Sequence, residues 1–207
     1  MDPEQDLKQR IVATALALAE PRSWEVVRLH EVAEAAGITL DELRVHFREK
    51  EDIVEAWFDR ADAAMLHAAT APGFLTLTTR QRLRCVIMAW LNALAAHRRV
   101  TRQMILGKLE PGHLHIQIPG IMRVSRTVQW FREAAHRDAA YVQRAFEEVA
   151  TTSIYLATFC YWMYDDSPGA AATEAFLELL LGIAERIAHA TVGRSAAVPA
   201  GTTEPPP

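Results

Sequence analysis

Few residues in the 207-residue sequence have the types and spacing that catalysis or metal binding requires. His113 and His115 form a His-x-His pair without a supporting acidic or cysteine ligand, so we interpret them as part of a polar loop. Asp165 and Asp166 are adjacent carboxylates at a predicted helix end, where they point apart and do not favour paired acid–base catalysis. Nucleophile-elbow, phosphate-loop and dinucleotide-binding motifs are absent from the sequence. We therefore expect no catalytic residues, no metal site and no cofactor.

The residues with the most specific chemical meaning lie in the segment 31–47. Ala33, Gly37 and Leu43 have the spacing of two short helices that cross steeply. Such a crossing needs a small side chain at the contact, a glycine in the turn and an apolar plug beneath the second helix. In a helix-turn-helix, that second helix enters the major groove of DNA. A helical hairpin inside a core has the same spacing, so both interpretations remain open here.

The elements that position this unit are predicted to be helices, because apolar residues recur with helical spacing and sustained strand alternation is absent. The expected helices cover residues 7–19, 30–36, 40–47, 50–70, 78–94, 119–137, 141–164 and 169–190. We expect an all-α protein with an N-terminal helix-turn-helix head at 1–50 and a C-terminal helical-bundle body at 51–192. The segment 193–207 is small, polar and proline-rich, which predicts a disordered tail.

The composition restricts the setting in which the chain works. Its apolar runs are shorter than the roughly 18 residues of a membrane span, and its start lacks a signal-peptide pattern. We therefore expect a cytoplasmic protein without a membrane span. Cys85 and Cys160 each stand in an apolar helical pattern, which predicts buried thiols rather than a disulfide or metal ligands.

The distribution of charge along the chain does not favour DNA binding by its N-terminal part. The formal net charge is −4, but residues 1–60 contain 14 acidic and 8 basic side chains, a net of −6, so the remainder carries +2. Because neutralisation of DNA phosphates supplies most non-specific affinity, an acidic head binds DNA only if its basic residues share one edge. A helix-turn-helix retained only as a scaffold is the alternative.

An ordered set of residues runs through positions 7–60. The set comprises Ile11 to Ala19, Trp24, Val32-Ala33, Ala36-Gly37, Leu43, His46-Phe47, Lys50-Glu51 and Ile53. It resembles the TetR family of bacterial transcription regulators, and the phrase His-Phe-Arg-Glu-Lys-Glu-Asp-Ile matches the end of that family's reading helix. The resemblance implies a DNA-reading head and a helical body that forms dimers and often holds a small ligand.

The resemblance also implies which residues contact double-stranded DNA. The expected contacts are Arg28, Thr39, Leu40, Arg44, His46, Arg48 and Lys50. Thr39 supplies the hydroxyl group that starts the family's reading helix, and His46 and Lys50 match positions used against phosphates. Arg44 replaces the family's usual aromatic residue and suits guanine, whereas Asp41 and Glu42 would either accept from cytosine or repel phosphate.

Two interpretations of the body remain open and are compatible with each other. The first is a core with a four-helix bundle between two copies, through the apolar stripe of the last helix, which comprises Phe176, Leu179, Leu180, Ile183 and Ile187. The second is an apolar ligand pocket, lined by Trp90, Met104, Met122, Trp130, Phe159 and Trp162.

The segment 153–190 contains the run Tyr-Trp-Met-Tyr-Asp-Asp-Ser. This segment resembles the carboxyl-terminal part of lipid-binding accessory proteins of coenzyme Q biosynthesis, which share the fold without regulating transcription.

From the TetR resemblance we expect a homodimeric regulator on a palindromic operator whose DNA affinity responds to an apolar small molecule or lipid. The alternative is a lipid or isoprenoid carrier that does not bind DNA.

Overall fold

The computed structural model of the chain describes residues 3–108, 126–131, 133–135 and 141–195. In this part of the chain every regular element is a helix, which confirms the predicted all-α class. The α-helices are α1 (Pro3–Ala19), α2 (Leu29–Ala36), α3 (Leu40–His46), α4 (Lys50–Ala68), α5 (Thr79–Leu94), α6 (Arg98–Lys108), α8 (Tyr141–Trp162) and α9 (Ala171–Ser195). Short 3-10 turns occur at η1 (Phe74–Thr76), η2 (Ala95–His97) and η3 (Pro168–Ala170).

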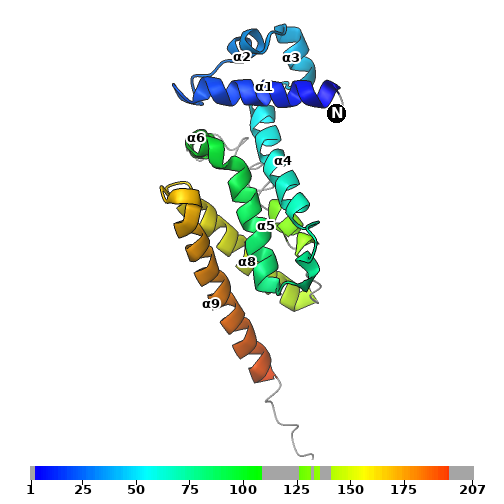
Figure 1. The fold of residues 1–207 in the computed structure, drawn as a ribbon, viewed down its shortest axis with the longest axis vertical. Coiled ribbons are helices and arrows are strands. Elements are labelled where there is room, and N and C mark those ends of the chain that lie inside the picture. The colour runs from blue at the N-terminus through cyan, green and yellow to red at the C-terminus, as the bar shows by residue number, and fades with distance from the viewer. Residues whose placement is uncertain (1–2, 109–125, 132, 136–140, 196–207) are drawn as a thin grey trace, which may run out of the picture.

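The first three helices form a head at one end of the molecule (Figure 1). α1 packs against α2, and α2 packs against α3. Ala33 of α2 and Leu43 of α3 are buried, with exposed fractions of 3% and 1%. The turn between these helices passes through Gly37 at φ 69°, in the left-handed region that favours glycine. The predicted contact residue, turn glycine and apolar plug are therefore confirmed.

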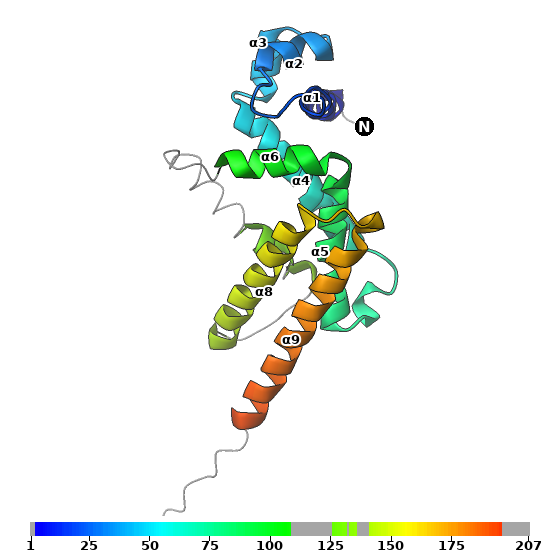
Figure 2. The same ribbon diagram turned by 90° about the vertical axis from the view of Figure 1, so that its left-hand side faces the viewer.

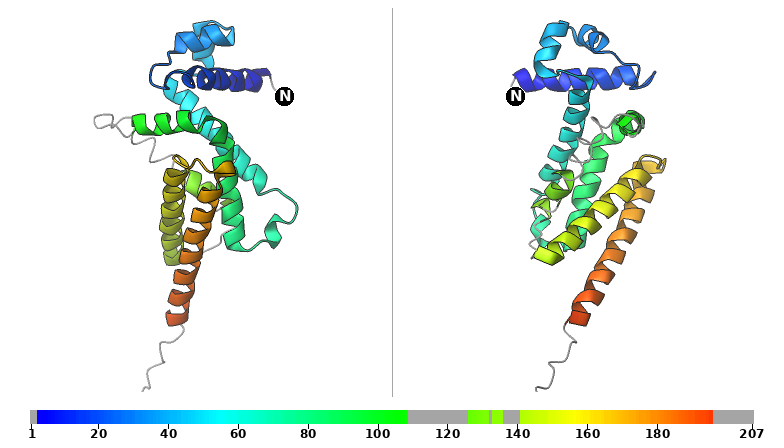
Figure 3. Two further views of the ribbon diagram at one scale, coloured as in Figure 1. Left: turned by 60° about the vertical axis from the view of Figure 1, so that its left-hand side comes forward. Right: turned by 180° about the vertical axis from the view of Figure 1, so that it is seen from behind.

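The body continues from the head through α4, which packs against both α1 and α5 (Figures 1 and 2). α6 lies between the head and the rest of the body in Figure 2. α8 packs against α9, and α5 contacts both of them. The carboxyl-terminal part of α9 extends beyond α5 and α8, as the two views of Figure 3 show.

The chain differs from the predicted helix pattern around residues 95–108. The predicted helices leave residues 95–118 unassigned, but Arg98, in the basic run at 97–102, begins the separate helix α6. η2 redirects the chain after α5, and α6 then buries Val100 and Met104, with exposed fractions of 0% and 2%. The basic residues therefore belong to a helix with a buried apolar side. The composition of the basic run does not reveal this side.

Other boundaries also differ from the expectations. α1 begins earlier than predicted, at Pro3, and α9 continues past the predicted tail boundary to Ser195. The loop at 113–118, the first part of the helix expected at 119–137 and the last part of the tail lie outside the described residues. Cys85 is partly buried, but Cys160 is exposed, so the prediction of two buried thiols is wrong. Cys160 faces outward because α8 buries its other side through residues such as Trp162.

Two features are absent from the part of the chain that the structure describes. None of its helices combines the length and the apolar character needed to cross a membrane. None of its side chains forms a group of three or more histidine, cysteine, aspartate or glutamate residues suited to hold a metal ion.

Candidate nucleic-acid interface and helical body

The predicted reading helix α3 has a fully formed N-terminal cap. The hydroxyl group of Thr39 accepts a hydrogen bond from the backbone amide of Glu42 at 3.1 Å. In return, Oε2 of Glu42 accepts from the Thr39 backbone amide at 2.7 Å and from its hydroxyl group at 2.8 Å. These hydrogen bonds from Thr39 lower the pKa of Glu42. Glu42 is therefore engaged in holding the start of α3 together, a reciprocal arrangement that its spacing from Thr39 predicts.

The solvent-facing side of α3 carries one ion pair and two apolar side chains. Nε and Nη2 of Arg44 both donate to Oδ1 of Asp41, at 3.2 and 3.1 Å. The side chains of Arg44 and Asp41 are 70% and 82% exposed. Leu40 and Val45 are also exposed. This surface therefore offers a cation, an anion and two apolar contacts to anything that approaches α3.

Lys50 is turned into the head rather than outward. Its ammonium group donates to the backbone oxygens of Trp24 at 2.5 Å and Glu25 at 3.1 Å. It also lies 4.7 Å from the centre of the Trp24 ring. Burial lowers the pKa of Lys50, and the like charge of Arg28 lowers it further. Lys50 consequently braces the segment between α1 and α2, and this inward role was not predicted.

The other expected DNA contacts divide into two groups. Arg28, Thr39 and Arg48 are exposed on the head together with the outer residues of α3. The side chain of His46, by contrast, is only 12% exposed, and its Nδ1 lies 3.9 Å from Oε1 of Glu4 on α1. The structure thus leaves Arg28, Arg44 and Arg48 as exposed cations among the expected contacts and places His46 largely inside the head.

Several carboxylates of the acidic head have structural partners. Asp52 accepts from the backbone amides of Arg48 and Glu49 at 2.7 and 3.1 Å, at the start of α4. Glu31 accepts from the backbone amide of Arg28 at 2.9 Å, at the start of α2. Carboxylates are favourable at helix N-termini because they satisfy free amide groups and oppose the helix dipole. Part of the negative charge that the sequence concentrates in the head therefore serves to begin helices.

The head and body meet through specific polar contacts. The backbone amide of Trp24 donates to Oε1 of Gln103 on α6 at 2.8 Å. Nδ1 of His97 lies 2.9 Å from Oε1 of Glu20 at the end of the head's first helix. These pairs are separated by 79 and 77 positions in the sequence. Sequence reasoning missed them because no local pattern signals pairing over such separations.

The body contains a connected group of buried aromatic rings centred on Trp90. The Trp90 ring lies edge-on to Tyr155 and Phe159, with centroid distances of 5.4 and 5.5 Å. Phe58 of α4 stacks on Trp90 at 5.8 Å, and Phe131 approaches its edge at 6.5 Å. Such offset and edge-to-face geometries are favourable for aromatic rings. The rings therefore join α4, α5 and α8 in one apolar cluster.

The residues expected to line a ligand pocket have different positions. Four of them are buried, namely Trp90, Met104, Phe159 and Trp162. Trp130 is 45% exposed and does not share this buried environment. Met122 lies outside the described residues.

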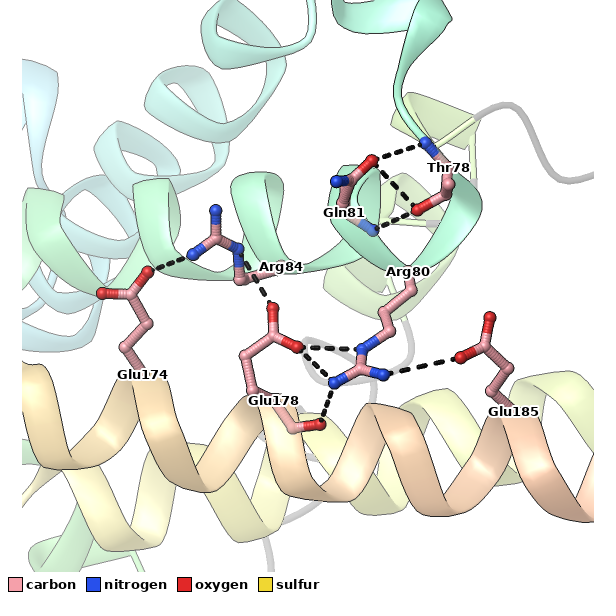
Figure 4. Close-up of polar contacts among 7 residues, drawn as sticks. All are labelled: Thr78, Arg80, Gln81, Arg84, Glu174, Glu178 and Glu185. Carbon is pink, nitrogen blue, oxygen red and sulfur yellow. Dashed lines mark hydrogen bonds and ion pairs between the residues drawn. The ribbon is translucent and has the colours of Figure 1, made fainter.

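One side of α9 is fixed to α5 by ion pairs (Figure 4). Nη2 of Arg80 lies 2.6 Å from Oε2 of Glu178, and its Nη1 lies 3.5 Å from Oε2 of Glu185. One turn along α5, Arg84 pairs with Glu174 at 2.5 Å and with Glu178 at 3.1 Å. These contacts set which side of α9 faces the body.

The expected dimer residues occupy another part of the α9 surface. Leu179, Ile183 and Ile187 are 55%, 38% and 58% exposed. Phe176 and Leu180 are half-buried beside them. The i, i+4, i+8 spacing of the three exposed residues makes one apolar stripe. We call these five residues the α9 stripe.

Comparison with solved structures identifies the family. A TetR transcriptional regulator from Nitrosomonas europaea is 50% identical to this chain, with a TM-score of 0.79, over 89% of this chain and 99% of that one. The chain therefore belongs to the TetR family of transcriptional regulators. This membership agrees with the resemblance seen in the head and does not favour the alternative of a lipid-binding accessory protein.

More distant structures share the fold. A TetR transcriptional regulator from Rhodococcus sp. RHA1 is 18% identical, with a TM-score of 0.61, and covers 86% of this chain and 97% of its own. The regulator FadR from Bacillus subtilis, in complex with stearoyl-CoA, is 17% identical to this chain, with a TM-score of 0.56. The match covers 84% of this chain and 97% of FadR. No protein-family model and no curated protein matches the chain.

Proposed function

We propose that this TetR-family regulator binds operator DNA as a homodimer through α3, and that an apolar ligand in its body changes the DNA affinity. The carrying observation is the outer face of α3, where Arg44 is exposed on a helix with a complete N-terminal cap. A capped, rigid helix holds its side chains in the geometry that base recognition in the major groove needs. Arg44 reads guanine, and Leu40 and Val45 contact thymine methyl groups.

Phosphate contacts fall to the exposed cations at the edges of this face. Arg28 and Arg48 are exposed, and both backbone amides are held by carboxylates that begin α2 and α4. Those carboxylates keep their charge, but each lies at the positive end of a helix dipole, which offsets part of its repulsion of phosphate. The repulsion is therefore weaker than the net charge of −6 over residues 1–60 suggests. Lys50 contributes by bracing the head rather than by contacting phosphate.

A second copy of the chain packs on the α9 stripe. The ion pairs with α5 turn the glutamates of α9 toward the body, and apolar residues of the stripe, such as Leu179, stay exposed. Two copies related by a two-fold axis would bury this stripe and present two reading helices. Two-fold symmetry in the protein requires two-fold symmetry in the operator, with half-sites about one helical turn apart.

The ligand occupies the body beside the aromatic cluster around Trp90. We expect an amphipathic ligand whose apolar part meets these rings. A polar group lies in the same region, where Oδ1 of Asp62 accepts hydrogen bonds from Trp90 Nε1 at 2.7 Å and from Thr127 at 3.3 Å. Stearoyl-CoA, the molecule bound by FadR, has this amphipathic character. A ligand changes DNA affinity only if it binds one arrangement of head and body better than another. The contacts between Trp24 and Gln103 lie where that arrangement is set.

Selection from a random duplex pool with the purified full-length chain tests this proposal. Enrichment of a palindrome supports a dimeric DNA-binding regulator, which acts in the cytoplasm where the chromosome lies. A pool without an enriched sequence would contradict it. If native mass spectrometry of the same preparation also detects bound lipid or isoprenoid, that result would favour the carrier function instead.

A further inference from the structure

Asp41 and Arg44 are held together on the face of α3 that remains open to solvent. A guanidinium group presents five N–H donors in a rigid plane, and two of its edges each offer a parallel pair of N–H donors. Asp41 takes the edge formed by Nε and Nη2, since both atoms donate to its Oδ1. The second edge, formed by Nη1 and Nη2, stays available. Among the described residues, none accepts a hydrogen bond from Nη1 of Arg44.

The available edge matches one base. Guanine presents two acceptors, O6 and N7, in the major groove, and an arginine that donates to both distinguishes guanine from the other bases. We propose that Asp41 is a positioning residue that orients Arg44 so that its Nη1–Nη2 edge meets a guanine. This inference rests on the DNA binding proposed above and adds the residue that sets its base preference.

The neighbouring acid cannot perform the same task. Both hydrogen bonds that reach the Glu42 carboxylate come from Thr39, at the N-terminal cap of α3. Asp41 is the acid of α3 whose carboxylate contacts Arg44 in the described structure. The two carboxylates of the reading helix therefore have different roles, one in beginning the helix and one in orienting its base reader.

Asp41 is expected to have two opposing effects on DNA binding. Measuring both effects distinguishes a residue that positions Arg44 from one that only forms a surface ion pair. Its negative charge repels the phosphates and lowers affinity for every sequence. Its hold on Arg44 raises preference for one base at one position. An exposed ion pair that only supports the helix would not alter base preference when removed.

The experiment compares Asp41→Ala with a control that removes an equivalent charge. Glu34→Ala deletes an exposed acid from α2 and leaves the contact between Asp41 and Arg44 intact. The probes are the duplex that the wild-type chain enriches from a random pool and copies of it with each base pair substituted in turn. Fluorescence anisotropy gives the Kd for each pair of protein and duplex, and circular dichroism verifies that each variant is folded.

For the wild-type chain, we expect substitution of one G·C pair to weaken binding by about ten- to a hundredfold. Both acid-to-alanine variants should bind the duplexes that lack this G·C pair more tightly, because each variant loses one negative charge. Of these two variants, only Asp41→Ala should lose at least two-thirds of the discrimination at the G·C pair. Asp41→Asn should lose a smaller part of that discrimination. In the background of Arg44→Ala, Asp41→Ala should not change base preference, since the two residues act through one contact.

The outcomes separate this inference from the function on which it rests. An enriched duplex with unchanged base preference in Asp41→Ala and Asp41→Asn would overturn the positioning role and leave DNA binding intact. Equal loss of preference in Glu34→Ala would also overturn it. A pool that yields no enriched duplex would overturn the proposed DNA binding, and the role of Asp41 with it.

Discussion

The backbone amide of Trp24, in the head, donates a hydrogen bond to the side-chain oxygen of Gln103, on α6. Trp24 belongs to the segment that Lys50 braces from the start of α4. One backbone segment is therefore held both by the helix that connects head and body and by the helix that lies between them. A change in the position of α6 relative to α4 would act directly on this segment of the head.

Replacing Gln103 with alanine should loosen this segment. The Trp24 amide would lose its acceptor, and a lost hydrogen bond of this kind lowers the free energy of unfolding by about 1 kcal/mol. Amide hydrogen exchange, followed by NMR, should become faster at Trp24. Gln9→Ala, at an exposed position of α1, is the matched control and should leave that exchange unchanged. Unchanged protection of Trp24 in Gln103→Ala would show that this contact does not hold the segment.

Lys50 and Arg48 allow bracing to be distinguished from phosphate contact. Lys50→Met keeps an unbranched apolar side chain but removes the donor to two backbone oxygens, so the free energy of unfolding should fall by about 1–3 kcal/mol. Arg48→Met should leave stability nearly unchanged and reduce the slope of log K against log salt by about 0.9. Chemical denaturation and salt-dependent anisotropy measure these effects. The opposite assignment, with Lys50 changing only the salt slope, would contradict the inward role.

Much of the head follows from local sequence, because its decisive residues are near neighbours. Ala33, Gly37 and Leu43 specify the crossing of α2 and α3, and each has the burial or backbone geometry that its spacing predicts. The inward direction of Lys50 does not follow from sequence. It depends on the backbone oxygens of Trp24 and Glu25, which lie far from Lys50 along the chain.

The body shows a sharper limit to sequence reasoning. The apolar stripe of α9 could be predicted from its helical period. The side of α9 that faces α5 could not, because it is set by pairs such as Arg80 with Glu178, 98 positions apart. Trp130 shows the same limit. Its large apolar side chain is typical of a pocket residue, yet Trp130 is 45% exposed. The position of a residue on its helix, and not its type alone, decides whether it is buried.

The dimer is tested by a charge placed in the α9 stripe. Leu179→Glu should convert a dimer into a monomer, since two buried carboxylates would face each other across the two-fold axis. Leu75→Glu is the control, because Leu75 is 63% exposed on η1, outside the stripe. Sedimentation velocity of the wild-type chain should show a dimer, and Leu75→Glu should match it. A dimeric Leu179→Glu would place the interface elsewhere, and a monomeric wild-type chain would contradict dimerisation itself.

Asp165 gives a prediction about acid stability. Burial raises the pKa of this carboxyl, but hydrogen bonds from Ser167 and Thr173 outweigh burial and hold the pKa well below its usual range. A lowered folded-state pKa contributes stability above the unfolded value of about 3.9, and this contribution is lost as pH falls through the folded value. Asp165→Asn should therefore cost about 1.5–3 kcal/mol near pH 7 and progressively less below about pH 4.

Denaturant unfolding over a pH series measures this difference. Asp166→Asn is the matched control, because Asp166 is exposed beside Asp165, and it should cost little at any pH. A cost of Asp165→Asn that stays constant from pH 7 to the acid limit would contradict the assignment of the hydrogen-bonded carboxylate as the stabilising form.

Sequence-specific DNA binding by the head is the property on which the proposed function depends. Its most direct test measures the Kd of the full-length chain for the enriched duplex and for a scrambled duplex of the same composition, across salt concentrations from about 50 to about 200 mM. We predict that both affinities fall with salt and that the enriched duplex stays at least about a thousandfold tighter. Equal affinities for the two duplexes at every salt concentration would show that the head does not bind DNA in a sequence-specific way.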